Sequence, residues 1–141
     1  MIRTFVIASA LTAALAGCST NGGEGNTLIE TFKREPVGNL LGAFETARFL
    51  DAACPQVSME LLAAPLVDRM REGRRNEVND VTMGALSRAT RNEGNAFMAA
   101  GGITYDLKGT PRDEWDTARV CPAAAAAVDS DTLVGIMLAP S

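Results

Sequence analysis

The chain has 141 residues, more acidic than basic side chains, a net charge of −4 and no histidine. This charge makes it a poor candidate for binding nucleic acid or an anionic lipid surface. Without histidine, serine triads, cysteine–histidine dyads and ordinary zinc hydrolase sites are excluded in their usual forms. We therefore expect no cofactor, no metal site and no nucleic-acid partner, and the length suits one small domain.

The N-terminal segment is typical of an exported protein. Arg3 precedes an uncharged, largely apolar run over 5–16. The run is short for a membrane span, which takes about 20 residues, but it fits the hydrophobic region of a secretory signal. It ends in a tetrapeptide that resembles the lipobox of bacterial lipoproteins at all four positions: Leu15, Ala16, Gly17 and Cys18.

This resemblance implies that residues 1–17 are a signal peptide, removed before Cys18, and that the Cys18 thiol carries diacylglycerol. Ser19 follows Cys18. In lipoproteins that resemble this chain, Asp at that position commonly retains the protein at the inner membrane, whereas Ser resembles the outer-membrane pattern. We expect a lipid-anchored protein at the outer membrane, facing the periplasm. The alternative is an ordinary signal peptide that leaves Cys18 as an odd thiol.

Residues 18–27 are rich in Gly, Asn and Ser, and they predict a lipidated flexible tether before a domain over 28–141. Two cysteines then remain, Cys54 and Cys121. In the oxidising compartment that the signal implies, such a pair predicts one disulfide. It would require the helix ending near Ala53 to pack beside the helix that carries Cys121. The alternative is two free thiols with a redox role.

The domain is predicted to be all-α, a small bundle of about four to six helices, because Ala, Leu, Met, Glu and Arg dominate and strict apolar alternation is absent. The expected helices begin at a capping Thr27, at Gly38, at a capping Ser58 and at Asn79 or Asp80, and they end near 35, 53, 72 and 100. Pro65 predicts a kink in the third helix. The buried face expected for that helix comprises Leu61, Leu62, Leu66, Val67 and Met70.

Two further helices are expected after a loop over 103–109. Thr110-Pro111 marks the start of one, with a capping Thr and Pro at the first helical position. This helix carries Trp115 and Cys121, and Pro122 predicts a kink. Ser130 or Asp131 is expected to cap a last, apolar helix that reaches Leu138.

Several short motifs resemble a family of small secreted bacterial helical proteins of unknown function. They are Cys54-Pro55-Gln56-Val57-Ser58, the stretch Phe97 to Ile103, Cys121, and the stretch Asp131 to Leu138. The resemblance implies a helical fold and a pairing of the two cysteines. It implies no activity.

Two charged clusters are the remaining candidate sites. Arg69, Arg71, Arg74 and Arg75 alternate with Asp68, Glu72 and Glu77, which favours a solvated helix face over a patch for an acidic partner. Asp113, Glu114 and Asp116 lie beside Trp115, and Asp129 lies near Asp131. Paired carboxylates beside an aromatic ring suit a cell-wall glycan hydrolase. Acids at helix starts also suit the helix dipole, and we favour that interpretation.

The sequence therefore predicts no catalytic residues. It favours a non-catalytic binding or assembly accessory whose partners are the membrane, through Cys18, and an envelope protein. The alternatives are a structural lipoprotein, a protective lipoprotein that blocks a toxin or phage, and a glycan hydrolase that uses Asp113, Glu114 and Asp116.

Overall fold

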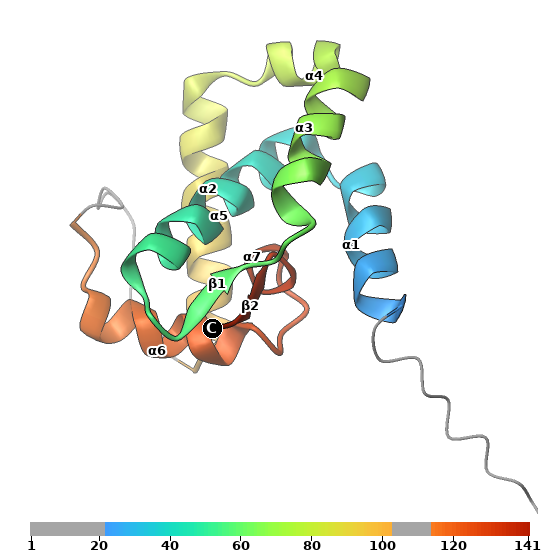
Figure 1. Ribbon diagram of the computed structural model, residues 1–141. Coiled ribbons are helices and arrows are strands. Elements are labelled where there is room, and N and C mark those ends of the chain that lie inside the picture. Colours follow the sequence, from blue (N-terminus) through green and yellow to red (C-terminus); the bar gives the residue numbers. More distant parts are fainter. Residues whose placement is uncertain (1–21, 103–113) are drawn as a thin grey trace, which may run out of the picture.

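The computed structural model describes residues 22–102 and 114–141. Within these residues the chain is helical apart from one small two-stranded sheet (Figure 1). The prediction of an all-α domain is confirmed. The elements in chain order are α1 Gly22–Arg34, α2 Val37–Ala53, β1 Val57–Met59, α3 Ala63–Gly73, α4 Arg75–Asp80, α5 Met83–Ala100, α6 Thr117–Ala127, α7 Leu133–Ile136 and β2 Leu138–Pro140.

The central element is α2, which is buried on most sides, as expected for a helix that is apolar nearly all round. It crosses α5 at very short range (Figure 1). A Cβ atom placed on Gly42 would lie 2.7 Å from the backbone nitrogen of Thr90 and 2.8 Å from the carbonyl carbon of Ala89. Only a glycine fits at this crossing without moving one of the two helices.

The C-terminal strand β2 packs beside β1, the strand that precedes α3. β2 pairs with β1 in antiparallel register, with Val57 opposite Pro140 and Met59 opposite Leu138. One more hydrogen bond continues this pairing: the Glu60 amide donates to the carbonyl of Met137. The chain end is thereby fixed beside the segment that follows α2.

A disulfide joins Cys54, just after α2, to Cys121 in α6, with a Cα–Cα distance of 5.2 Å and a separation of 67 residues. The predicted pairing is confirmed. The predicted packing of α2 beside the helix that carries Cys121 is confirmed as well. Helix α5 lies within the closed loop and packs on both α2 and α6. The redox alternative, which needs two free thiols, is wrong.

Three predicted helix starts are wrong. The first helix begins at Gly22, so residues 22–27, assigned to the tether, are helical. Ser58 caps no helix, because it lies in β1 and pairs with Ala139. The start expected at Asn79 or Asp80 falls at the end of α4, and α5 begins after Thr82, whose hydroxyl accepts a hydrogen bond from the Ala85 amide at 3.1 Å.

The two prolines predicted to cause kinks lie within continuous helices. Pro65 is in the first turn of α3, where its missing N–H leaves no helical bond unmade. Pro122 lies inside α6, which nevertheless continues to Ala127.

The two C-terminal helices also differ from expectation. Helix α6 starts at Thr117 with Asp116 as its cap, whereas the cap expected at Thr110, with Pro111, lies outside the described residues. The last helix is capped by Thr132 rather than by Ser130 or Asp131. It is shorter than expected, because Leu138 already belongs to β2.

Candidate functional site

The predicted lipid attachment site lies outside the described residues, as do the residues around it: Leu15, Ala16, Gly17, Cys18 and Ser19. The structure bears on it in two ways. Helix α1 begins at Gly22, four positions after Cys18. The chain has three cysteines, and Cys54 and Cys121 are bonded to each other in the core. Cys18 is thus the single cysteine outside this disulfide.

Among the described residues, the acidic cluster around Trp115 comprises Glu114, which is exposed, and Asp116, which caps α6. Trp115 is only 5% exposed, and its ring packs edge-on against Phe49, with ring centroids 5.4 Å apart. It therefore offers no open aromatic platform for a sugar. Glu114 is exposed, and Asp113 lies outside the described residues.

Asp116, in the same cluster, stabilises the start of α6. Its Oδ1 accepts a hydrogen bond from the Ala118 amide at 3.1 Å, which caps α6. Its Oδ2 lies 3.7 Å from Arg119 Nε. This geometry supports the helix-start interpretation of the acid cluster.

The second acid pair, Asp129 and Asp131, is exposed in the turn between α6 and α7. Hydrogen bonds of two hydroxyl groups stabilise this turn. Ser130 Oγ donates to the Ala127 carbonyl at 2.7 Å, and Thr132 Oγ1 accepts from the Gly135 amide at 3.0 Å. The pair flanks a helix cap, as the sequence indicated.

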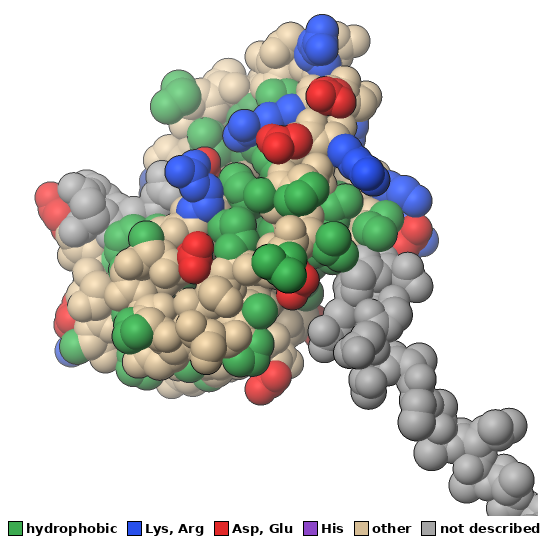
Figure 2. All heavy atoms as spheres, in the orientation of Figure 1, with side chains coloured by type: hydrophobic (Ala, Val, Ile, Leu, Met, Phe, Trp, Pro, Cys, Tyr) green, Lys and Arg blue, Asp and Glu red, His purple; other side chains and the backbone are tan. Residues whose placement is uncertain are grey.

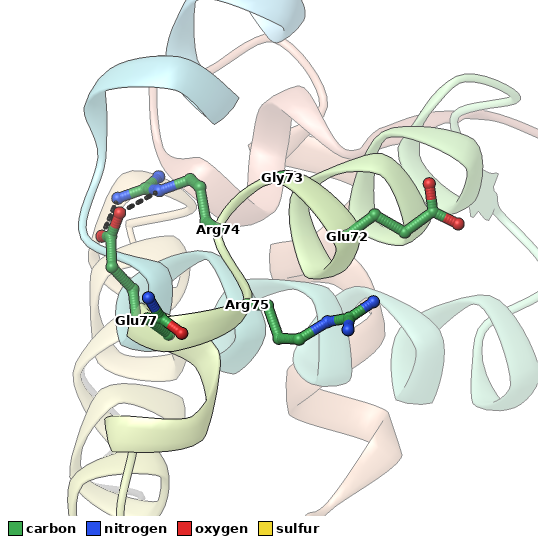
Figure 3. Close-up of a pocket in the computed structure, with 6 residues that line it drawn as sticks. Glu72, Gly73, Arg74, Arg75 and Glu77 are labelled. Atoms are coloured by element: carbon green, nitrogen blue, oxygen red, sulfur yellow. Dashed lines mark hydrogen bonds and ion pairs between the residues drawn. The ribbon is translucent and has the colours of Figure 1, made fainter.

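The arginine cluster divides into one structural residue and three exposed ones. Arg74, between α3 and α4, donates from Nη1 to the carbonyl of Glu35 at 2.8 Å and to that of Phe32 at 3.2 Å. The same guanidinium binds the Glu77 carboxylate through two hydrogen bonds (Figure 3). The other arginines, Arg69, Arg71 and Arg75, are exposed.

The electrostatics of the Arg74–Glu77 pair follow from this geometry. The hydrogen bond with Glu77 raises the pKa of Arg74, and the hydrogen bond with Arg74 lowers the pKa of Glu77. Both groups stay charged across the physiological range. Since the C-terminal carbonyls of a helix have no partners within it, Arg74 serves as a cap that joins the end of α1 to the end of α3.

A surface hollow of about 540 Å³ surrounds this pair. In Figure 3 the side chains of Glu72 and Arg75 point away from Arg74 and Glu77. The lining residues carry both signs of charge: Glu72, Gly73, Arg74, Arg75, Asn76 and Glu77. Because Arg74 and Glu77 satisfy each other, the hollow does not present a single charge to an ionic ligand.

Two features were not found from the sequence. Glu93 on α5 is partly buried, and burial, followed by the nearby charge of Glu35, raises the pKa of its carboxyl. Leu61 and Leu62, predicted to be buried, are 88% and 43% exposed. The prediction failed because it started a helix at Ser58, whereas β1 occupies that position and Leu61 falls in the turn after it.

In the described ranges, no helix is long and apolar enough to cross a membrane. The same residues contain no group of three or more Cys, Asp or Glu side chains placed to hold a metal ion. The chain matches no family model, no curated protein and no solved structure.

Proposed function

We propose that the chain is a lipoprotein of the bacterial cell envelope, anchored through lipid on Cys18, and that its helical domain is a non-catalytic binding or assembly accessory. The observation that carries this proposal is the tetrapeptide Leu15-Ala16-Gly17-Cys18 after an apolar segment. This motif ends in the one cysteine of the sequence that is not part of the Cys54–Cys121 disulfide.

The disulfide supports export. Structural disulfides persist in oxidising compartments such as the periplasm and are rare in the cytosol. Cys54 and Cys121 are both buried, and their bond closes a loop of 67 residues. The domain is therefore suited to the compartment that the signal implies.

The non-catalytic part of the proposal rests on the side chains that a hydrolase would need. Asp116 caps α6, and Trp115 is packed in the core. A glycan hydrolase built on Asp113, Glu114 and Asp116 is thus less well supported than a binding role at the outer membrane. A structural or protective envelope lipoprotein remains the alternative.

Processing provides the first test. In a bacterium labelled with radioactive palmitate, the wild type and a Ser19→Ala control should carry label. Cys18→Ala should carry none and should run as a larger, uncleaved precursor. Label in Cys18→Ala would overturn the proposed anchor.

Pulldown tests the role of the domain. The lipid-modified protein, used as bait in detergent-solubilised envelope, should recover a partner in a fixed molar ratio. Recovery of no partner, together with release of fragments from purified peptidoglycan, would instead favour the hydrolase.

A further inference from the structure

We propose that the turn before α3, at Leu61 and Leu62, contacts the bilayer next to the lipid anchor. This inference rests on the proposed anchor at Cys18 and adds a second, non-covalent membrane contact. Leu61 and Leu62 are exposed, and so are Ala64 and Pro65. Figure 2 shows hydrophobic side chains gathered over α3 and the turn that precedes it.

The segment is unusual because four of its five consecutive apolar residues, 61–65, are exposed. Single exposed apolar side chains are normal on soluble proteins, whereas a contiguous exposed patch marks an interaction surface. Between residues 61 and 65 only Ala63 is buried. Transfer of a leucine side chain from water to an apolar phase lowers the free energy.

The path of α1 places this turn at the anchored end of the domain. Figure 1 shows α1 and α3 side by side and running in the same direction. Arg74 ties the end of α3 to the end of α1 through the carbonyls of Phe32 and Glu35. From that junction, α1 extends back over 13 residues and α3 over 11, or about 20 and 17 Å. Both helices therefore start away from that junction, toward the same side of the domain, and Figure 1 shows the start of α3 beside the middle of α1.

The short connection to the anchor then brings this end to the membrane. Gly22 is four residues after Cys18, and four residues reach at most about 14 Å in any conformation. The start of α1 must therefore stay close to the lipid surface, and the turn at Leu61 lies on the same side of the Arg74 junction as this start. This geometry favours the bilayer, rather than a protein partner, as the occupant of the apolar turn.

The chain offers a matched control. Met83, at the start of α5, is 81% exposed, close to the 88% of Leu61. It lies beyond α4, at the opposite end of α3 (Figure 1). Leu61→Trp and Met83→Trp each place a fluorescent reporter at an exposed apolar position, one at the proposed contact and one away from it.

The experiment uses protein expressed from the full chain, purified from membranes and reconstituted in phosphatidylcholine vesicles. Its mass first shows whether Cys18 carries acyl chains, so failure of the anchor is seen separately. In vesicles with brominated acyl chains, Leu61→Trp should lose most of the emission it adds to that of Trp115. Met83→Trp should keep its added emission.

Three results would overturn the proposal. The first is absence of acyl chains on Cys18, which removes its basis together with the anchor. The second is equal quenching of both variants, or no quenching of Leu61→Trp. The third is burial of the reporter at position 61 that depends on protein concentration rather than on lipid, because this would assign the turn to a second copy of the chain.

Discussion

At the scale of single residues, two helical glycines should respond in opposite ways to the same substitution. In Gly42→Ala the added methyl group meets backbone atoms of Ala89 and Thr90 at 2.7–2.8 Å, so α2 and α5 must move apart. We expect a loss of about 1–3 kcal/mol in the free energy of unfolding, typical of overpacking. In Gly73→Ala the new Cβ has no neighbour within 4 Å, and alanine should stabilise α3 by up to about 1 kcal/mol. Urea unfolding of both variants measures the difference, and equal midpoints would refute the close crossing.

The raised pKa of Glu93 predicts that the free energy of unfolding depends on pH. Burial, then the charge of Glu35, raises its pKa above the ordinary value of 4.5. Burial penalises the ionised carboxylate in the folded state and not in the unfolded state. Stability from this group is therefore highest below the unfolded pKa and is lost as the pH rises through the folded pKa.

The substitution Glu93→Gln tests this linkage. It should raise the melting temperature at pH 7, and the gain should shrink as the pH falls towards 4.5. Glu72→Gln, which removes an exposed carboxylate, is the control and should show no such pH-dependent gain. A pH-independent effect of Glu93→Gln would mean that packing, rather than charge, sets its contribution.

At the scale of helices, Arg74 links α1 to α3. Arg74→Ala leaves the carbonyls of Phe32 and Glu35 without this donor and Glu77 without its ion pair. We expect a loss of about 1–3 kcal/mol, with faster hydrogen exchange in α1 than in α5. Arg75→Ala, at an exposed neighbouring position, should change stability by no more than about 0.5 kcal/mol. Identical thermal unfolding of the two variants would show that the link carries no stability.

The disulfide should contribute more than any of these contacts. On the chain-entropy account, closing the 67-residue loop stabilises the fold by about 4 kcal/mol, an upper figure. Replacing Cys54 and Cys121 together by Ala should therefore lower the urea midpoint clearly. Mass spectrometry of an unreduced digest should show the peptides of Cys54 and Cys121 cross-linked. Ready alkylation of both thiols in the native protein would contradict the pairing.

The sequence predicted those elements whose signals are local or combinatorial. The α2 helix was predicted because Leu40, Phe44 and Ala47 repeat at helical spacing and Cys54-Pro55 ends the run. The cysteine pairing followed because only two cysteines remained after Cys18. The sheet could not be predicted, since three-residue strands show no periodicity and β1 forms only when β2 returns beside it.

The same distinction applies to the candidate site. The lipid attachment proposed at Cys18 rests on a linear motif, which requires no fold. The exposure of Leu61 depends on the pairing of β1 with β2, in which Val57 lies opposite Pro140, 83 positions later in the chain. The sequence pattern, which started a helix at Ser58, therefore predicted wrongly that Leu61 is buried. The role of Arg74 was also hidden, because its main acceptors lie about 40 residues earlier in the chain.

At the scale of the whole molecule, the position of a lipoprotein depends on sorting, because an anchor of two or three acyl chains is effectively permanent. Ser19 resembles the residue that releases lipoproteins to the outer membrane. In a two-membrane host we expect the wild type and Ser19→Ala to sediment with outer membrane on a sucrose gradient. Ser19→Asp should move part of the protein to the inner membrane while leaving its lipid and its fold unchanged. Wild-type protein found wholly with inner membrane would contradict the sorting argument, but it would leave the anchor at Cys18 and the contact at Leu61 untouched, since both require only a bilayer.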